Sequence, residues 1–210
     1  MIDWSEYAKF FIGLLAIVNP IGIVPVFMGL TRNLSAPERS RVGLRAAITV
    51  GTVLVVALLM GEALLGFFGI SLDSFRVAGG ILILLMAISM LHGGMSPAKQ
   101  TSEEAQDAEE KENVSVVPLG MPLLAGPGAI STIIIYSHRG QDIAHYVLLF
   151  SIAIVLALLT WLALRAAPAI ADRLGRTGLN IVTRIMGLIL AAIGVEFMAN
   201  GLRQLFPGLG

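Results

Sequence analysis

The chain has 210 residues, of which 56% are apolar and only 13% are charged, and its 14 basic residues balance its 14 acidic ones. Soluble globular domains usually carry about 25% charged residues, so this composition is typical of a protein that lies in a lipid bilayer. A net charge of zero argues against nucleic acid as a partner, and the lack of cysteine excludes disulfides, thiolate metal sites and cysteine nucleophiles.

Six apolar runs are long enough to cross a membrane, because about 20 helical residues span ~30 Å of hydrocarbon. Four of these runs contain no charged residue: 10–31, 77–98, 113–137 and 143–164. The other two, 46–72 and 185–202, each contain one carboxylate, Glu62 and Glu196. The sequence therefore predicts an all-α membrane protein with six transmembrane helices.

The first run is interrupted in its middle by Asn19-Pro20-Ile21-Gly22 and by Pro25. Proline removes a backbone donor and clashes with the carbonyl group four residues earlier, and glycine weakens a helix further. Unpaired backbone groups in hydrocarbon cost several kcal/mol, so such a break persists only where protein or a water-filled cavity covers it. We expect the first helix to be broken at this point.

The second and third runs carry the charged residues Glu62 and Arg76. A carboxylate inside a membrane span is a functional hypothesis by default, but Glu62 lies nearer the outer end than the centre of its run. The alternative is that it reaches the interface or pairs with Arg76. Arg76 and Arg184, at the starts of the third and sixth runs, are expected to be interfacial anchors.

The segment 99–113 is charged and poor in apolar residues, which predicts a flexible linker between two halves, 1–98 and 114–210. Six crossings place most basic residues on the linker's side: Arg32, Arg39, Arg41, Arg45, Lys99, Lys111, Arg165, Arg173, Arg176 and Arg184, against Lys9, Arg76, Arg139 and Arg203. Basic residues favour the cytoplasm. We therefore expect a cytoplasmic linker and both termini in the periplasm.

The fourth run is interrupted like the first, by Pro122 and by Gly126-Pro127-Gly128. Pro127 follows Pro20 by 107 residues, and Arg184 follows Arg76 by 108. This shared offset predicts a repeat of three helices. Because each half crosses the membrane an odd number of times, one half is inverted relative to the other. Inverted repeats are frequent in secondary transporters. The alternative is that two apolar segments merely have similar composition.

Two breaks at matching positions of inverted halves are expected to meet near the midplane. Half-helix N-termini suit a carboxylate, and unwound carbonyl groups suit an ammonium group or a cation, so a small zwitterion would find both partners there. The predicted substrate-binding residues are Asn19, Pro20, Gly22, Pro25, Gly126, Pro127, Gly128, Ser131 and Thr132. The alternative is a pair of proline kinks that serve packing.

The remaining candidates concern coupling, solvation and packing. Glu62 and Glu196 are possible sites of coupling to protons; a sodium ion is the alternative coupling partner. His92, His138 and His145 fall at the ends of spans and are expected to be solvated. Small residues at four-residue spacing, such as Gly187 with Ala191, predict close helix packing. No enzyme motif, metal cluster or cofactor motif is present in the sequence.

At Asn19-Pro20-Ile21-Gly22-Ile23-Val24-Pro25-Val26-Phe27 and at Pro122-Leu123-Leu124-Ala125-Gly126-Pro127-Gly128-Ala129-Ile130-Ser131-Thr132, the chain resembles the MarC family of inner-membrane proteins of bacteria and archaea. The segment Phe75-Arg76-Val77-Ala78-Gly79-Gly80 fits as well, and the resemblance covers essentially the whole chain. It implies a six-helix, multi-pass protein of the inner membrane and transport of neutral amino acids such as glycine or alanine. The alternatives are export of drugs or other metabolites, and a membrane scaffold that transports nothing.

Overall fold

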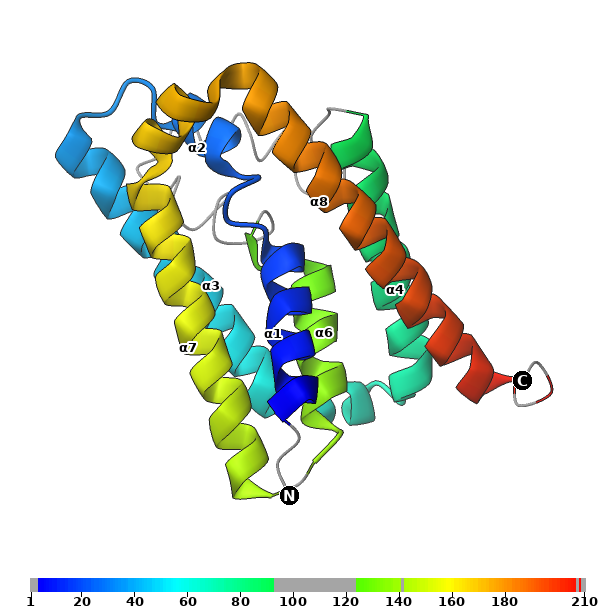
Figure 1. Ribbon diagram of the computed structural model, residues 1–210. Helices are drawn as coiled ribbons and strands as arrows, with labels where there is room; N and C mark the ends of the chain where they lie inside the picture. The colour runs from blue at the N-terminus through cyan, green and yellow to red at the C-terminus, as the bar shows by residue number, and fades with distance from the viewer. Residues whose placement is uncertain (1–3, 93–123, 141, 207, 209–210) are drawn as a thin grey trace.

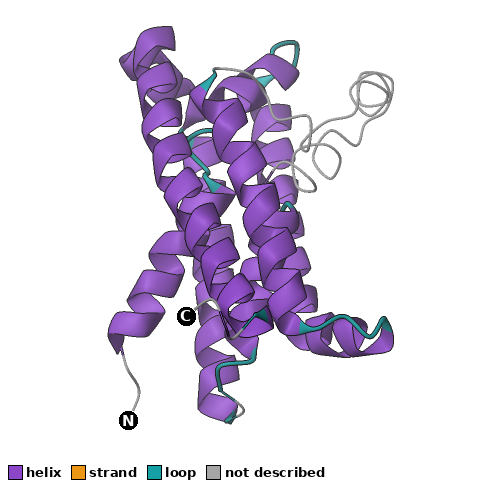
Figure 2. Ribbon diagram, turned by 90° about the vertical axis from the view of Figure 1, so that its right-hand side faces the viewer, coloured by secondary structure: helices purple, strands orange, loops and turns teal. Residues whose placement is uncertain are grey.

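The structure is a computed structural model that describes residues 4–92, 124–140, 142–206 and 208. The helices in this part of the chain are α1 (Trp4–Val18), α2 (Val24–Leu30), α3 (Ala36–Phe67), α4 (Leu72–Leu91), α6 (Pro127–Ser137), α7 (Ile143–Arg165) and α8 (Ala167–Leu205) (Figure 1). The described residues form no strand, and Figure 2 shows helices joined by short loops. The all-α prediction is therefore confirmed for these residues.

Four of the helices are long and apolar enough to cross a membrane: α3, α4, α7 and the part of α8 from Thr177 onward. The chain is thus an integral, multi-pass membrane protein. The first predicted span consists of two shorter helices, α1 with 15 residues and α2 with 7. The fourth is described only from Leu124 on, and the whole of the predicted linker 99–113 lies outside the described residues. A total of six spans stays a prediction.

Two helices extend beyond the predicted apolar runs. Helix α3 begins at Ala36, well before residue 46, because Ser35 and Glu38 form a capping box in which the Glu38 carboxylate accepts the backbone N–H of Ser35 at 2.8 Å. Helix α8 begins at Ala167 and bends at Gly175, whose φ of 59° is favourable only for glycine. Arg184 therefore lies inside α8 rather than at the start of a helix, contrary to the prediction. The charged residues between 172 and 184 excluded this part of α8 from the apolar run, although it is helical.

The described helices form two pairs with three shorter helices between them. Helix α3 packs against α7, and α4 packs against α8; α1, α2 and α6 fill the space between the pairs (Figure 1). Helix α6 packs on α4, and α2 packs on α8. Buried side chains from these elements, among them Phe10, Ile17, Phe27, Ile83 and Ile133, form the core.

The α4–α8 pair is close enough for the two backbones to touch. Gly187, Gly194 and Gly201 follow one another at seven-residue spacing along α8. A Cβ atom at Gly194 would lie 2.8 Å from the carbonyl oxygen of Gly80, and one at Gly201 would lie 2.8 Å from that of Asp73. Small residues allow this approach between membrane helices. The predicted packing role of Gly187 is confirmed, because a Cβ atom there would lie 3.1 Å from the Ala87 carbonyl oxygen.

Candidate functional site

The first helix is broken where the sequence predicts. Helix α1 ends at Val18, and Asn19 adopts a left-handed backbone conformation with φ of 49°, which asparagine tolerates better than most residues. The Asn19 side-chain oxygen accepts the backbone N–H of Gly22 at 3.1 Å, and α2 begins at Val24 with Pro25 in its first turn. The Asn19 side chain thus supplies an acceptor for one of the backbone N–H groups at the break.

The second break also lies at the predicted place, on the side that the structure describes. Gly126 is extended, with φ of −71° and ψ of 176°, and α6 begins at Pro127. Proline suits this first helical position because its missing N–H would have no partner inside the helix. The Gly126 carbonyl oxygen accepts the N–H groups of Ala129 and Ile130 at 2.9 and 3.2 Å. Helix α6 therefore begins at the break, where Gly126 and Gly128 are buried and Pro127 is exposed.

The structure brings the two breaks together. A Cβ atom at Gly128 would lie 3.4 Å from Ile17 in the last turn of α1 and 2.7 Å from Ile83 of α4. The C-terminal end of α1, with its partial negative charge, therefore lies next to the N-terminal end of α6, with its partial positive charge. Helix ends of opposite partial charge thus lie within one region, as the two charges of a zwitterion would require.

The predicted binding residues are held in different ways around this junction. Asn19 and Pro20 are buried, and the Asn19 amide lies 3.9 Å from the Met90 sulfur. Pro25 and Pro127 are exposed, and Gly22 packs directly on the Asn19 side chain.

Farther along α6, Ser131 is buried against Gly79 of α4. The Thr132 hydroxyl donates to the Gly128 carbonyl at 2.7 Å. Of all the predicted binding residues, Thr132 is the one that lines a described cavity. Binding by the others stays a prediction.

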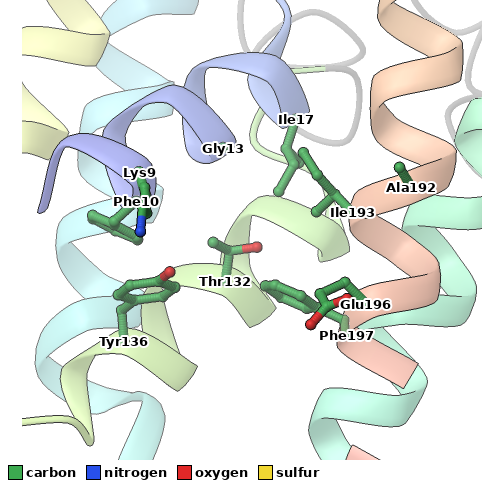
Figure 3. Close-up of a pocket in the computed structure, with 10 residues that line it drawn as sticks. All are labelled: Lys9, Phe10, Gly13, Ile17, Thr132, Tyr136, Ala192, Ile193, Glu196 and Phe197. Carbon is green, nitrogen blue, oxygen red and sulfur yellow. The ribbon is translucent and has the colours of Figure 1, made fainter. Parts of the chain in front are cut away.

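A cavity of about 370 Å³ lies between α1, α6 and α8 (Figure 3). It is lined by Lys9, Phe10, Gly13, Ile17, Thr132, Tyr136, Ala192, Ile193, Glu196 and Phe197. On α1, the lining residues extend from Ile17, beside the breaks, to Lys9. Ile17 follows Lys9 by eight residues, which corresponds to about 12 Å along the helix axis at a rise of 1.5 Å per residue. The cavity thus extends from the breaks toward the end of the molecule that carries the N-terminus of α1.

Two opposite charges line this cavity. Lys9 comes from α1 and Glu196 from α8, and Figure 3 shows them on opposite sides with Thr132 between them. Lys9 forms no ion pair with any described residue, whereas the Glu196 carboxylate accepts the Asn200 amide at 2.9 Å. A molecule in this cavity would meet a cation on one side, a carboxylate on the other and a hydroxyl group between them.

Sequence reasoning missed Lys9 and Tyr136. Lys9, Gly13 and Ile17 recur at four-residue spacing, so they lie on one face of α1; this spacing, continued backward from the break, is the signal that could have found Lys9. Tyr136 had no such signal. Its ring packs on Phe10 with the centroids 4.3 Å apart, a contact that depends on how α1 and α6 meet.

Glu62, the other candidate for coupling, lies away from this cavity. It is an exposed residue near the end of α3, and its carboxylate lies 3.7 Å from Nε2 of His138. The alternative pairing with Arg76 is not formed, because Arg76 pairs with Asp73 at 3.3 Å, one turn away on α4. A coupling role for Glu62 stays a prediction, whereas Glu196 is placed at the cavity wall.

His145 is buried, so the expectation that it is solvated is wrong. Its Nδ1 lies 2.6 Å from the Tyr7 hydroxyl and its Nε2 lies 2.8 Å from the Tyr136 carbonyl oxygen. The carbonyl can only accept, so Nε2 carries the hydrogen and the Tyr7 hydroxyl donates to Nδ1 in the neutral ring. His145 joins α7 to α1 and α6 because the first turn of α7 faces both helices.

Comparisons with known proteins show the family of the chain. A family model described as MarC family integral membrane protein matches residues 4–206. The chain belongs to this family. The MarC family relatives include the UPF0056 membrane protein YhcE of Escherichia coli (strain K12), which is 46% identical over 208 residues, 99% of this chain and 96% of the relative. The UPF0056 membrane protein YvbG of Bacillus subtilis (strain 168) is 39% identical over 208 residues, 98% of each chain. No solved structure matches the chain.

Proposed function

We propose that this MarC family protein is a secondary transporter of small neutral amino acids, such as glycine or alanine, in the inner membrane. The observation that carries the proposal is the cavity that begins beside two broken helices and bears Lys9 and Glu196 on opposite walls. An amino acid would place its carboxylate toward Lys9 and its ammonium group toward Glu196. Each charged group of the substrate would then have a partner of opposite charge in place of water. Such a partner is required because the transfer of an unpaired charge out of water is costly.

The arrangement of the helices supports a transporter rather than an enzyme or a scaffold. Two inverted three-helix repeats, 1–98 and 114–210, would explain why α2 packs on α8 as α6 packs on α4. In such proteins, substrate and coupling ions bind where broken helices meet, and one repeat rocks against the other. Glu196, at the cavity wall, would also be the group through which a proton or a sodium ion is coupled.

In the proposed orientation, both termini face the periplasm. The cavity would then extend from the breaks toward the periplasmic surface, because Lys9 lies in the second turn of α1 and Ile17 lies near its end. The breaks would close the inner end of the cavity, and substrate would pass them to the cytoplasmic side when the repeats move.

Export of a larger, aromatic compound is a second candidate, and one observation favours it. Phe10, Tyr136 and Phe197 line the cavity and offer ring surfaces that an aromatic ligand would contact. The volume of about 370 Å³ lies at the small end of the ~300–1,000 Å³ range of ligand pockets. We therefore favour the smaller substrate.

Uptake into liposomes tests the proposal directly. Purified protein in liposomes is expected to accumulate labelled glycine or alanine above empty liposomes when a proton or sodium gradient is applied. Glu196→Gln and Lys9→Gln should each lower uptake at low substrate concentration about tenfold or more, because each removes one charged partner worth ~1.5–3 kcal/mol. Arg203→Gln, a change of an exposed charge in the last turn of α8, should leave uptake unchanged.

The outcomes separate the candidates. Uptake no better than that of empty liposomes under every gradient would exclude amino acid transport. Uptake of an aromatic cation or drug in its place, reduced by Phe197→Ala, would support the second candidate. Failure of both, with normal insertion of the protein, would leave the scaffold alternative.

A further inference from the structure

Helix α3 begins, α7 ends and α8 begins at the end of the molecule opposite the N-terminus of α1 (Figure 1). A second cavity lies among these helix ends. Its volume is about 260 Å³, and it is lined by Ala36, Arg39, Ser40, Leu164, Arg165 and Pro168. Two guanidinium groups and a hydroxyl group thus line it, and none of its described lining residues is a carboxylate. The first turn of α3 adds the partial positive charge of a helix N-terminus.

Arg39 has a buried donor that the described part of the chain leaves unused. Its Nη2 donates to the Thr31 carbonyl oxygen at 3.2 Å, which fixes the guanidinium group in place. Its Nε is buried and has no hydrogen-bond partner among the described residues. Buried donors in folded proteins are almost always paired, so this atom calls for an acceptor from outside the described residues.

The neighbouring carboxylate is engaged elsewhere. Glu38 precedes Arg39, but its Oε2 accepts both the backbone N–H and the hydroxyl group of Ser35, at 2.8 and 2.5 Å. Neither Arg39 nor Arg165 forms an ion pair within the described residues. Neither guanidinium group of the cavity is therefore paired with a described carboxylate.

Apolar surface continues from this cavity along the two membrane helices that flank it. The Arg165 guanidinium lies over the Trp161 ring, 5.4 Å from its centre, and tryptophan typically marks the level of the lipid headgroups. One to two turns deeper, Leu158 and Leu162 of α7 are 51% and 45% exposed. A ligand here would have its anionic group in the cavity and hydrocarbon along α7.

We propose that this cavity binds the phosphate group of an anionic phospholipid. Arg39 and Arg165 would hold the phosphate oxygens by charged hydrogen bonds, which guanidinium groups form in pairs, and the Ser40 hydroxyl would donate a third. Basic pockets between transmembrane helices on the cytoplasmic side suit lipid headgroups. The bound lipid would join α3 to the α7–α8 junction, and the site is independent of the proposed transport cavity.

Thermal stability in neutral detergent tests this site. Dioleoyl phosphatidylglycerol is expected to raise the melting temperature in a saturable way, whereas dioleoyl phosphatidylcholine, which has the same chains and no net charge, should not. Arg165→Gln should raise the half-saturating concentration of phosphatidylglycerol about tenfold, as expected for the loss of one charged hydrogen bond. Arg173→Gln, a change of an exposed arginine of α8 outside the cavity lining, is the matched control and should respond like the wild type.

A second variant and a second ligand complete the test. Arg39→Gln should show the same weakening; if it does not fold because the bond to Thr31 is lost, Arg165→Gln still decides the question. Inorganic phosphate should protect much less than phosphatidylglycerol at equal concentration. Equal protection by inorganic phosphate or by phosphatidylcholine, or an unchanged response of Arg165→Gln, would overturn the proposal.

Discussion

The contact between α4 and α8 makes Gly194→Ala a sensitive test of the fold. The added methyl group would lie 2.8 Å from the Gly80 carbonyl oxygen and 3.0 Å from the Leu84 backbone nitrogen. Both neighbours are backbone atoms, so a side-chain rotation cannot relieve the overlap and the helices must separate. Overpacking of this kind costs about 1–3 kcal/mol, against a gain in helix propensity of at most ~1 kcal/mol.

The net loss should lower the melting temperature by several degrees, since a domain of this size shifts by about 2–4 °C per kcal/mol. The assay is thermal unfolding of the purified protein in detergent. Gly66→Ala is the matched control, because a methyl group there meets nothing within 4 Å and α3 should keep or gain stability. A Gly194→Ala protein that melts with or above the wild type would refute the close packing of α4 on α8.

The break and the topology give two further predictions. Asn19→Val should destabilise the protein by at least about 1–2 kcal/mol, because a β-branched residue resists the left-handed conformation. Asn19→Gly should cost less stability in the same melting assay. Equal losses for the two variants would show that the side-chain contacts of Asn19, and not its backbone conformation, determine the stability of the break. Single cysteines at Asn33 and Gln204, exposed near the end of α2 and at the end of α8, test the orientation in a chain without native cysteine. A membrane-impermeant thiol reagent should label Gln204→Cys and spare Asn33→Cys in intact cells, and the reverse pattern would invert the proposed orientation.

Local chemistry determined the positions of the breaks. Proline at positions 20 and 127 and glycine at 22 and 126 act on the backbone within a few residues of themselves, so their effect can be predicted from the sequence alone. The same holds for the apolar runs, since hydropathy depends on a stretch of neighbouring residues. Helix ends were predicted less well, because the capping box at Ser35 extends α3 into a polar segment that hydropathy excludes.

Only the tertiary structure decided which side chains share a site. Lys9 and Glu196 lie almost at opposite ends of the chain and line one cavity because α1 and α8 pack around α6. Arg39 and Arg165 come together because α3 packs on α7, and His145 is buried because α7 also meets α1 and α6. A helix has several faces of similar apolar character in a membrane protein, and the face that turns inward depends on close packing with helices distant in the sequence.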